Sequence, residues 1–468
     1  MSTRQRRFSV AAATLFVFFG ALVAWDAVRS GVALPWRHMY DFPVTYCGGR
    51  VVAGGNDPFR YEPLHHCQQQ VGGTDFHSDP ARVLPWVIPP YSFPLLAVLG
   101  RMQFDAARTV FAVLVAGATL ACVVFLASLG IDVTLVFAAL LLCVGYLLLY
   151  AANVVAFTLL AVVLCGWALS KKHSVAAGIF AAAGLMEPHI TLPICAAVFL
   201  FGGLRARIAL LAGAAVLAGV AAMVPIAQIL EYATRVLPAQ AVAETHFPYQ
   251  YSLTYVLTLF GTPPQPAILA GNLMYAALAV AAIGVGYKLS KTLNRPEMIV
   301  FTPAAAVVFG GSYMHMVDIG FALPAALVLA TEARGRARTI AGAALCLLAV
   351  PWLGAWQFHH LFLLSIFVCA VILWRLHVPL LSAAVIVTAV ALTLYAFDPI
   401  PGSFHSGLGP LHYPPDGLAV TVWQIIVAGT SAPVAPWLAI KIPTWLGLGT
   451  VLGLAWLMRH PKRDTVTA

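Results

Sequence analysis

The chain has 468 residues, of which 61% are hydrophobic and only 9% are charged, and its mean hydropathy is +0.89. Ordinary soluble domains carry roughly 25% charged residues, so this composition excludes a soluble globular protein. The net charge of +9 does not indicate a nucleic-acid-binding protein, because the Lys and Arg residues concentrate in the short connections that we place in the cytoplasm.

Apolar runs long enough to cross the hydrocarbon core of a bilayer as helices recur along the whole chain. A transmembrane β-barrel would instead show alternating segments of about ten residues. The sequence therefore predicts an all-α polytopic membrane protein. We expect a bundle of about 11–13 transmembrane helices, with re-entrant or broken helices and outer-face loops.

The first apolar run covers residues 8–25 and follows three arginines, Arg4, Arg6 and Arg7. This pattern resembles a secretory signal sequence, and we interpret it as a retained signal anchor. Its basic flank places the N-terminus in the cytoplasm. The polar stretch that follows, about 26–83, is then the first outer loop.

Further spanning helices follow this loop. They are expected at about 84–100, 106–128, 153–169, 206–226, 266–287, 338–356, 361–376, 378–396 and 434–457. Residues 131–150 are expected to turn back on the outer side, because Lys171 and Lys172 would otherwise face outward.

One apolar stretch is expected to be a broken helix. A proline between two apolar runs of about 13 residues favours a break, so 174–186 and 189–201 should meet at Glu187-Pro188-His189. An unpaired charge inside apolar sequence costs about 2.5–3.5 kcal/mol on insertion scales. Glu187 and His189 therefore require a partner or a polar cavity, and an ion pair between them and a contact with substrate are equally good interpretations.

A second broken helix is expected where residues 297–312 and 316–331 meet at Tyr313-Met314-His315. His315 lies close in sequence to Asp318. It is a candidate for binding a phosphate or orienting an acceptor, and a buried structural histidine is the alternative.

This topology places the long polar loops, at about 26–83, 227–265 and 397–433, on the outer side. The cytoplasmic connections are short and basic, and the sequence shows neither a Walker A loop nor a dinucleotide fingerprint. We therefore expect the protein to act outside the cytoplasm, without ATP or a nucleotide sugar.

Two cysteines, Cys47 and Cys67, share the first outer loop. A disulfide between them would suit an oxidising compartment and would brace the segment that carries Asp41. His65 and His66 lie beside Cys67, but the second ligand pair of a zinc site is missing. We therefore predict no metal and no other cofactor.

A series of short motifs occurs in a fixed order. They are Asp41 with Tyr46 five positions later, Gly55-Asn56-Asp57-Pro58-Phe59, Pro89-Pro90, Asn153, Glu187-Pro188, Tyr251-Ser252-Leu253 and Ser312-Tyr313-Met314-His315-Met316. Their order resembles the GT-C glycosyltransferases, most closely the polyprenyl-phosphate-mannose-dependent mannosyltransferases of the phosphatidylinositol-mannoside type. The resemblance spans residues 8–331, so we divide the chain into a catalytic membrane module, 1–331, and a C-terminal helical part, 332–468.

The resemblance has two departures from the family pattern. Ala151-Ala152 replace a Gly-Gln pair before Asn153, and Glu187 replaces a lysine. In the family that lysine is a plausible partner for the donor phosphate. His189 or a loop arginine would then take its role here, or the donor would bind differently.

The resemblance implies a sugar transferase that uses a polyprenyl-phosphate-sugar donor, with mannose favoured, and a lipid or glycan acceptor. It would act on the extracytoplasmic face of a bacterial inner membrane, with inversion and without a metal. Asp41 is the candidate general base, because a carboxylate within reach of the acceptor hydroxyl can take its proton. The candidate substrate-binding or phosphate-binding residues are His315, His189, Glu187, Arg60, Arg37, Tyr46 and Asn153. Arginine is expected among them because it matches phosphate bidentately.

Two other functions stay open. A secondary transporter would also have broken helices, but it should show an internal repeat, which we do not find. An O-antigen ligase or polymerase would use undecaprenyl-linked glycans and would be expected to place an arginine in a large late loop. The loop at 397–433 contains histidines but no arginine.

Overall fold

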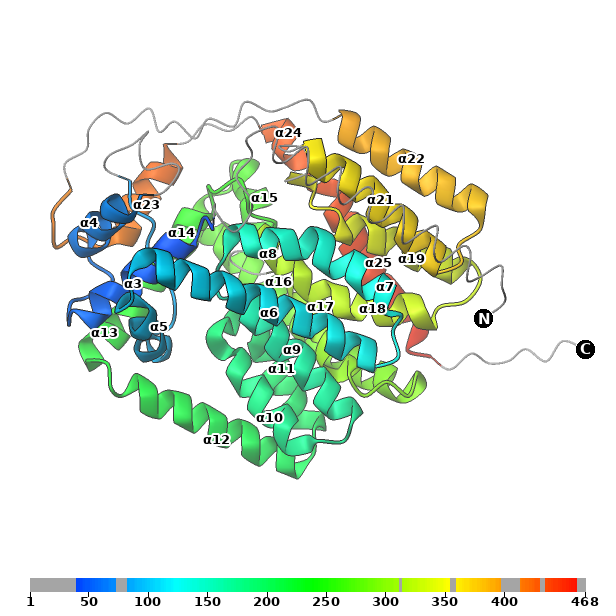
Figure 1. Cartoon of the computed structure of the whole chain (residues 1–468), viewed down its shortest axis with the longest axis horizontal. Helices are drawn as coiled ribbons and strands as arrows, with labels where there is room; N and C mark the ends of the chain where they lie inside the picture. Colours follow the sequence, from blue (N-terminus) through cyan, green and yellow to red (C-terminus); the bar gives the residue numbers. More distant parts are fainter. Residues whose placement is uncertain are drawn as a thin grey trace, which may run out of the picture.

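The computed structural model describes residues 39–72, 82–310, 314–353, 359–396, 413–429 and 434–460. Within these ranges the chain is helical, with two isolated β-bridges and no strand (Figure 1). The prediction of an all-α fold is confirmed for this part of the chain.

The helices, including short 3₁₀ and π segments marked η, occur in the following order. They are α3 (Phe42–Ala53), α4 (Tyr61–Val71), η1 (Pro90–Ser92), α5 (Phe93–Gly100), α6 (Phe104–Ser128), α7 (Val133–Val136), η2 (Phe137–Val144), α8 (Gly145–Ala151), α9 (Val155–Ser170), α10 (Ser174–Ala183), η3 (Gly184–Met186), α11 (Pro188–Phe201), α12 (Leu204–Ala221), α13 (Ile226–Glu231), η4 (Tyr232–Val236), α14 (Leu237–Glu244), α15 (Leu253–Leu259), α16 (Pro264–Thr292), α17 (Met298–Val307), η5 (Met316–Ala322), α18 (Leu323–Glu332), α19 (Arg336–Ala349), α21 (His359–Arg375), α22 (Leu380–Ala396), α23 (Ala419–Ala428), α24 (Val434–Ala439) and α25 (Ile442–Met458).

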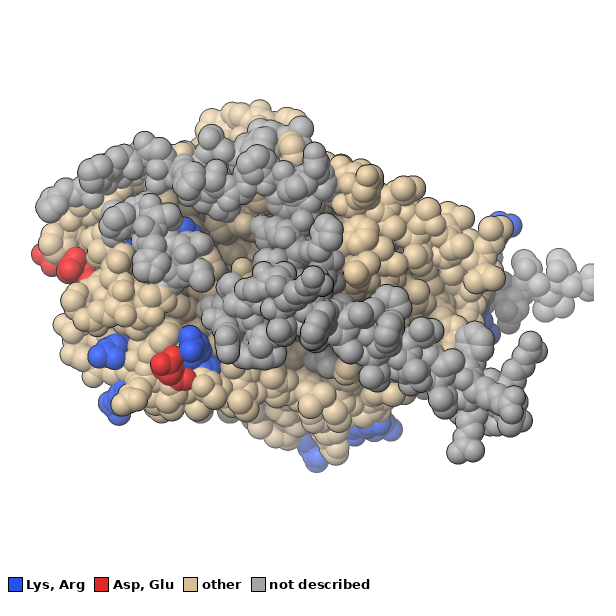
Figure 2. Space-filling model, turned by 45° about the horizontal axis from the view of Figure 1, so that its top comes forward, with Lys and Arg blue, Asp and Glu red and all other residues tan. Residues whose placement is uncertain are grey.

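Five helical segments in the described ranges are long and apolar enough to cross a membrane. They are Phe104–Ser128, Val133–Ala151, Leu204–Ala221, Pro264–Thr292 and Pro436–Met458. On the face drawn in Figure 2, Lys, Arg, Asp and Glu occupy only small patches and most of the remaining described surface is uncharged. The structure thus has the apolar helices expected of a membrane protein.

The charged residues at one end of the bundle hold several helix ends together. Lys171 donates to the Ser128 carbonyl at 3.2 Å, and Arg295 donates to the Leu129 carbonyl at 2.6 Å. Arg375 forms an ion pair with Asp132. We call this the basic end of the bundle.

The expectation that residues 131–150 turn back is wrong. Val133–Ala151 is one continuous helical segment, which begins after Asp132, whose side chain caps it by accepting from the Leu135 amide at 3.0 Å. The segment runs from the basic end to the far end of the bundle, where Asp41 donates its amide to the Ala151 carbonyl at 2.7 Å. Lys171 consequently lies at the basic end without any turn.

The expected helix at 84–100 is also wrong as a spanning helix. The structure has only η1 and α5 there, and eight residues of α-helix are about 12 Å long. The short α5 packs closely on α3, since a Cβ built at Gly100 would lie 2.2 Å from the Arg50 backbone nitrogen. The segment Pro90–Gly100 is therefore a short helical piece that packs on α3.

The two broken helices are confirmed, and each is a hairpin. In the first, Thr191 donates to the Gly184 carbonyl at 2.8 Å and Cys195 donates to the Ala181 carbonyl at 3.3 Å. The donor later in the sequence, Cys195, contacts the earlier carbonyl, Ala181, so α10 and α11 run antiparallel. The chain turns between them at Glu187.

The second hairpin joins α17 to η5 and α18. Its return arm ends at Glu332, which pairs with Arg295 at 2.7 Å at the basic end. At its turn, the His315 amide donates to the Asp318 carboxylate at 2.7 Å, which starts η5. Tyr313 lies outside the described residues. Both hairpins therefore turn at the end of the bundle that lies opposite the basic end.

Among the other expected helices in the described ranges, the best matches are α6, α9, α12, α16, α21 and α22, and the helix expected at 434–457 comprises α24 and α25. The signal anchor expected at 8–25 lies outside the described residues. The helix expected at 338–356 ends earlier, because α19 stops at Ala349 and Val350 is extended.

The close packing of α3 on α5 predicts an effect of adding one methyl group. Gly100→Ala should lower the free energy of unfolding by about 1–3 kcal/mol, the usual cost of overpacking, because the new Cβ has no room beside Arg50. Thermal unfolding in detergent would measure the change. Gly117→Ala in α6 is the control, since nothing lies within 4 Å of a Cβ at that position. Equal melting temperatures for both variants would contradict the packing.

Candidate functional site

A cavity of about 1140 Å³ lies where the two hairpins turn. Its wall includes Asp41 before α3, Glu187 and His189 from the first turn, and His315 and Asp318 from the second. Four chain segments that are far apart in sequence therefore meet at one polar surface: the start of α3, the α8–α9 junction at Asn153 and both hairpin turns.

Asp41 is positioned by the end of α8. The amides of Tyr40 and Asp41 donate to the carbonyls of Tyr150 and Ala151 at 2.8 and 2.7 Å, which anchors the backbone of Asp41 to the end of α8. Asn153 donates through its side-chain amide to the Asp41 carboxylate at 3.1 Å. The structure thus places Asn153 beside Asp41 in the cavity wall.

The local turn explains why Asn153 can reach Asp41. Ala152 adopts a left-handed conformation with φ of 51°, which ends α8. The side-chain oxygen Oδ1 of Asn153 accepts from the Val155 amide at 3.1 Å at the start of α9. The other side-chain atom, Nδ2, then faces the Asp41 carboxylate.

Burial raises the pKa of Asp41 to about 6. The positive charge of His315 and the Asn153 hydrogen bond lower it, while the nearby Glu244 charge raises it further. A carboxyl group with a pKa near neutrality can accept and release a proton under physiological conditions, as a general base requires.

His315 forms an ion pair with Glu244, with 3.3 Å between Nε2 and a carboxylate oxygen. Glu244 is 2% exposed and also accepts from the side-chain amides of Gln240 and Gln250. Burial lowers the pKa of His315, but the charges of Glu244, Asp318 and Asp41 outweigh burial and raise it to about 9. His315 is therefore a cation at neutral pH.

The segment before α15 supports the second turn. Gln250 and His315 form an antiparallel bridge, and the Tyr251 amide donates to the Met314 carbonyl at 2.8 Å. Lys441, at the start of α25, donates to the Pro248 carbonyl and lies 3.8 Å from the Tyr255 ring centroid. The last helix of the described chain thus supports the turn that carries His315.

Glu187 and His189 are paired with each other and also line the cavity. The distance from His189 Nδ1 to the Glu187 carboxylate is 3.4 Å, and His189 Nε2 lies 4.0 Å from the Asp318 carboxylate. The sequence left open whether the two residues pair or face a cavity, and the structure shows both.

Arg82 is the one Lys or Arg among the cavity-lining residues in the described ranges. It is 8% exposed, donates to the Tyr40 hydroxyl at 2.8 Å and lies over the Trp423 ring at 5.7 Å. Sequence analysis did not separate it from the other outer arginines, because nothing in the sequence shows which loop residue folds inward.

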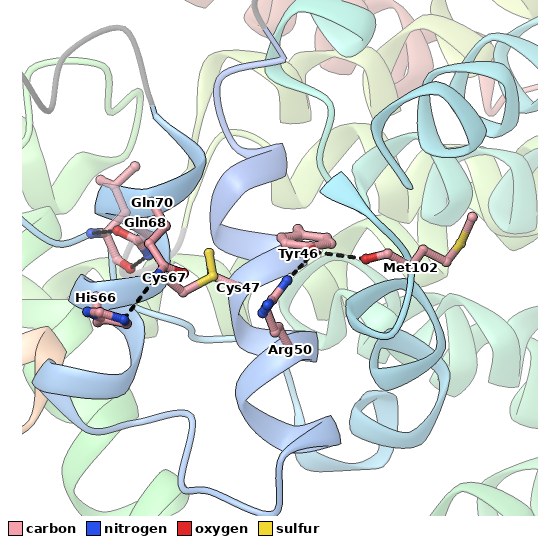
Figure 3. The surroundings of a disulfide bond; sticks show 9 residues. Tyr46, Cys47, Arg50, His66, Cys67, Gln68, Gln70 and Met102 are labelled. Atoms are coloured by element: carbon pink, nitrogen blue, oxygen red, sulfur yellow. Dashed lines mark hydrogen bonds between the residues drawn. A yellow bond between two sulfur atoms is a disulfide. The ribbon is translucent and has the colours of Figure 1, made fainter. Parts of the chain in front are cut away.

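Two of the predicted phosphate-binding residues do not line the cavity. Arg60 pairs with Asp57 at 2.8 Å and with Glu231, so its charge serves to join the first outer segment to α13. Tyr46 is buried, donates to the Met102 carbonyl at 2.9 Å and accepts from Arg50 at 2.9 Å (Figure 3). Both have structural roles here, and Arg37 lies outside the described residues.

The disulfide considered from the sequence is present between Cys47 and Cys67 (Figure 3). It joins α3 to α4, and the Gln68 side chain on α4 exchanges two hydrogen bonds with the backbone of Leu84, at 2.8 and 3.0 Å. The disulfide therefore connects the helix that follows Asp41 to the extended segment that follows Arg82.

The C-terminal part also contributes to the cavity. Trp423 from α23 and Leu353 are lining residues, although both lie beyond residue 331. α23 packs beside α4 in Figure 1, where the Ala419 amide donates to the Phe59 carbonyl at 2.9 Å. The cavity wall is thus shared by both predicted modules.

In the ranges that the structure describes, no group of three or more His, Cys, Asp or Glu side chains is arranged to hold a metal ion. Comparison with protein-family models, with curated proteins and with solved structures gave no match. The function is therefore argued from the cavity itself. Its chemistry combines a carboxylate of near-neutral pKa, a protonated histidine and a buried arginine.

Proposed function

We propose that this chain is a membrane glycosyltransferase of the GT-C type. It transfers a sugar, with mannose favoured, from a polyprenyl-phosphate-sugar to a hydroxyl of a lipid or glycan acceptor. The observation that carries the proposal is the position of Asp41, held by Asn153 at 3.1 Å, in a cavity that also contains His315 and Arg82. A base and two cationic groups are what such a transfer requires.

The proposal includes a membrane orientation. The basic end, with Lys171, Arg295 and Arg375, would face the cytoplasm of a bacterial inner membrane, as the positive-inside rule favours. The cavity at the opposite end would then open on the extracytoplasmic face. A polyprenyl-linked donor cannot leave the bilayer, so a cavity at the membrane surface among apolar helices suits it.

The reaction would be a single displacement with inversion. The acceptor oxygen attacks the anomeric carbon while its proton passes to the Asp41 carboxylate. The bond between the anomeric carbon and the phosphate oxygen breaks, and its electron pair stays on the departing polyprenyl phosphate. One bond forms and one breaks, so no co-reactant is needed.

The negative charge that develops on the leaving phosphate needs stabilisation. Arg82 and the protonated His315 are the cationic groups placed for it, and their preorganisation lowers the barrier because they need not reorient. Glu187, which replaces the family lysine, is paired with His189 at 3.4 Å and supplies no positive charge. Arg82 would take over the role of that lysine.

Replacing the proposed base tests the function directly. Asp41→Asn should reduce sugar transfer by about 10²–10⁴-fold, the usual contribution of a general base, while donor binding persists. Transfer from a panel of polyprenyl-phosphate sugars to a total lipid extract would be measured with purified protein. Asp57→Asn is the matched control, since Asp57 pairs with Arg60 and does not line the cavity.

An Asp41→Asn variant as active as the wild type would move the base elsewhere. Transport of a labelled glycan without transfer would favour a transporter, and transfer of a preassembled glycan from undecaprenyl diphosphate would favour a ligase.

The pKa values of the two site residues predict a pH profile. The base must be ionised, so kcat/KM should fall as pH drops below about 6, where Asp41 becomes protonated. The cation must keep its proton, so activity should fall again above about 9, where His315 loses it. A bell-shaped profile is therefore expected. Asn153→Ala should move the acidic limb to higher pH, because it removes a hydrogen bond to the ionised carboxylate. A flat profile between pH 5 and 7 would exclude Asp41 as the base.

The proposed phosphate contact predicts a separate effect on the donor. Arg82→Gln should raise the donor KM by about 10–100-fold, as expected for loss of a charged hydrogen bond of about 1.5–3 kcal/mol, and leave the acceptor KM near its original value. Arg235→Gln serves as control, because Arg235 is 64% exposed and pairs with Glu231. An unchanged donor KM in Arg82→Gln would contradict the assignment.

A further inference from the structure

The cavity has a second, apolar side that the proposed chemistry does not use. Leu192 on α11, Ala221 at the end of α12 and Ile268 on α16 line it. Leu192 is 55% exposed, although it lies only three residues after His189. The polar and apolar parts of the cavity are therefore directly adjacent.

Leu192 begins an exposed stripe along α11. The stripe continues through Ala196 and Phe199 to Leu200, which are four, seven and eight residues further on and so share one face of the helix. Phe199 is 41% and Leu200 is 50% exposed. We call these four residues the α11 stripe, and at 1.5 Å per residue it is about 12 Å long.

The other faces of α11 are covered. α11 packs against α10, α12, α16 and α17, and its residues Ile190, Ile194 and Val198 are buried. Near the basic end, Phe201 stacks on Tyr287 of α16 with ring centroids 4.2 Å apart. The α11 stripe is therefore the exposed face of α11 between α12 and α16, and it begins at the cavity.

Both flanking helices are apolar and are candidates for membrane spans. On α16, two polar residues interrupt this character. Gln265 and Asn272 are seven residues apart, are exposed and line the cavity. They mark where polar lining gives way to apolar surface along α16.

We infer that the α11 stripe, between α12 and α16, binds the polyisoprenyl chain of the lipid-linked donor, with its phosphate and sugar in the adjacent cavity. The inference rests on the proposed function and adds the place and direction of the donor chain. An amphiphilic donor needs a polar pocket that continues into an apolar path to the hydrocarbon. The junction at Leu192 provides this continuity, because the polar group of His189 and the start of the α11 stripe lie within one turn of α11.

Chain length distinguishes this surface from the rest of the site. Leu192→Trp should obstruct the start of the α11 stripe and raise the KM of an undecaprenyl-phosphate-sugar donor about tenfold or more. The KM of a donor that carries the same sugar on methyl phosphate should stay unchanged, because this donor has no chain to reach the stripe. Leu120→Trp on α6 is the matched control, since Leu120 is 54% exposed and does not line the cavity. Equal thermal unfolding of the two variants shows that both are folded.

The inference fails if Leu192→Trp raises the KM of both donors equally, which would mean that it disturbs the head-group site. It also fails if neither KM changes, which would mean that the chain binds elsewhere.

A binding experiment separates this inference from the proposed function. p-Benzoylphenylalanine is incorporated in place of Leu192, and the protein is irradiated with undecaprenyl phosphate in detergent. A saturable cross-link that excess undecaprenyl phosphate suppresses, and phosphatidylglycerol does not, supports the binding surface even if no sugar transfer is detected. Equal cross-linking to both lipids would show ordinary lipid contact and overturn the inference, even if transfer by the wild type confirms the proposed function.

Discussion

The structure depends on pairing charged side chains at the turns of two helix hairpins, inside a bundle that is otherwise apolar. A lone charge in such surroundings costs several kcal/mol, so each one must find a partner. Glu187 pairs with His189, and His315 with Glu244. Glu244 lies on a different segment from His315, and His189 of the first turn lies 4.0 Å from Asp318 of the second. These contacts therefore also hold the two turns and α14 beside one another. The cavity is the space that remains between these pairs, and its polarity follows from them.

The sequence predicted the features that rest on composition and local pattern. Hydropathy identified most helices, and Pro188 marked a real break, because proline is favoured in the first turn of a helix and here begins α11. The position of Asp41 was inferred from motif order, and the structure places Asn153, Glu187, His189 and His315 beside the same cavity. The agreement concerns their positions, since the catalytic roles remain proposals. The error at 84–100 arose from hydropathy, because an apolar run does not reveal whether it packs on protein or lipid. The error at 131–150 followed from it, since one spanning helix too many required a turn to keep Lys171 on the cytoplasmic side. One expected span is absent and one expected turn is a span, so the predicted directions of the later helices are unchanged.

The residues that sequence reasoning missed are those defined by long-range contacts. Glu244 is an ordinary loop acid in the sequence, and only the fold buries it between Gln240, Gln250 and His315. Arg82 differs from Arg60 in the same way, since one folds toward the cavity and the other pairs with Glu231. Tyr46 fits the motif, but its hydroxyl donates to the Met102 carbonyl and accepts from Arg50. No local pattern distinguishes such residues, because their environment depends on segments that are distant in the sequence, such as Met102 for Tyr46, His315 for Glu244 and Trp423 for Arg82.

Lys441 links the last helix of the described chain to the segment that supports His315. Its side chain is fully buried and supports the Pro248 carbonyl in the segment that pairs with His315. This support comes from the last helix of the described chain, which is synthesised and inserted after every other part of the cavity. A nascent chain that stops before α25 would contain all the polar residues of the site without their final alignment. The order of the site therefore depends on α25 as well as on the segments that line the cavity.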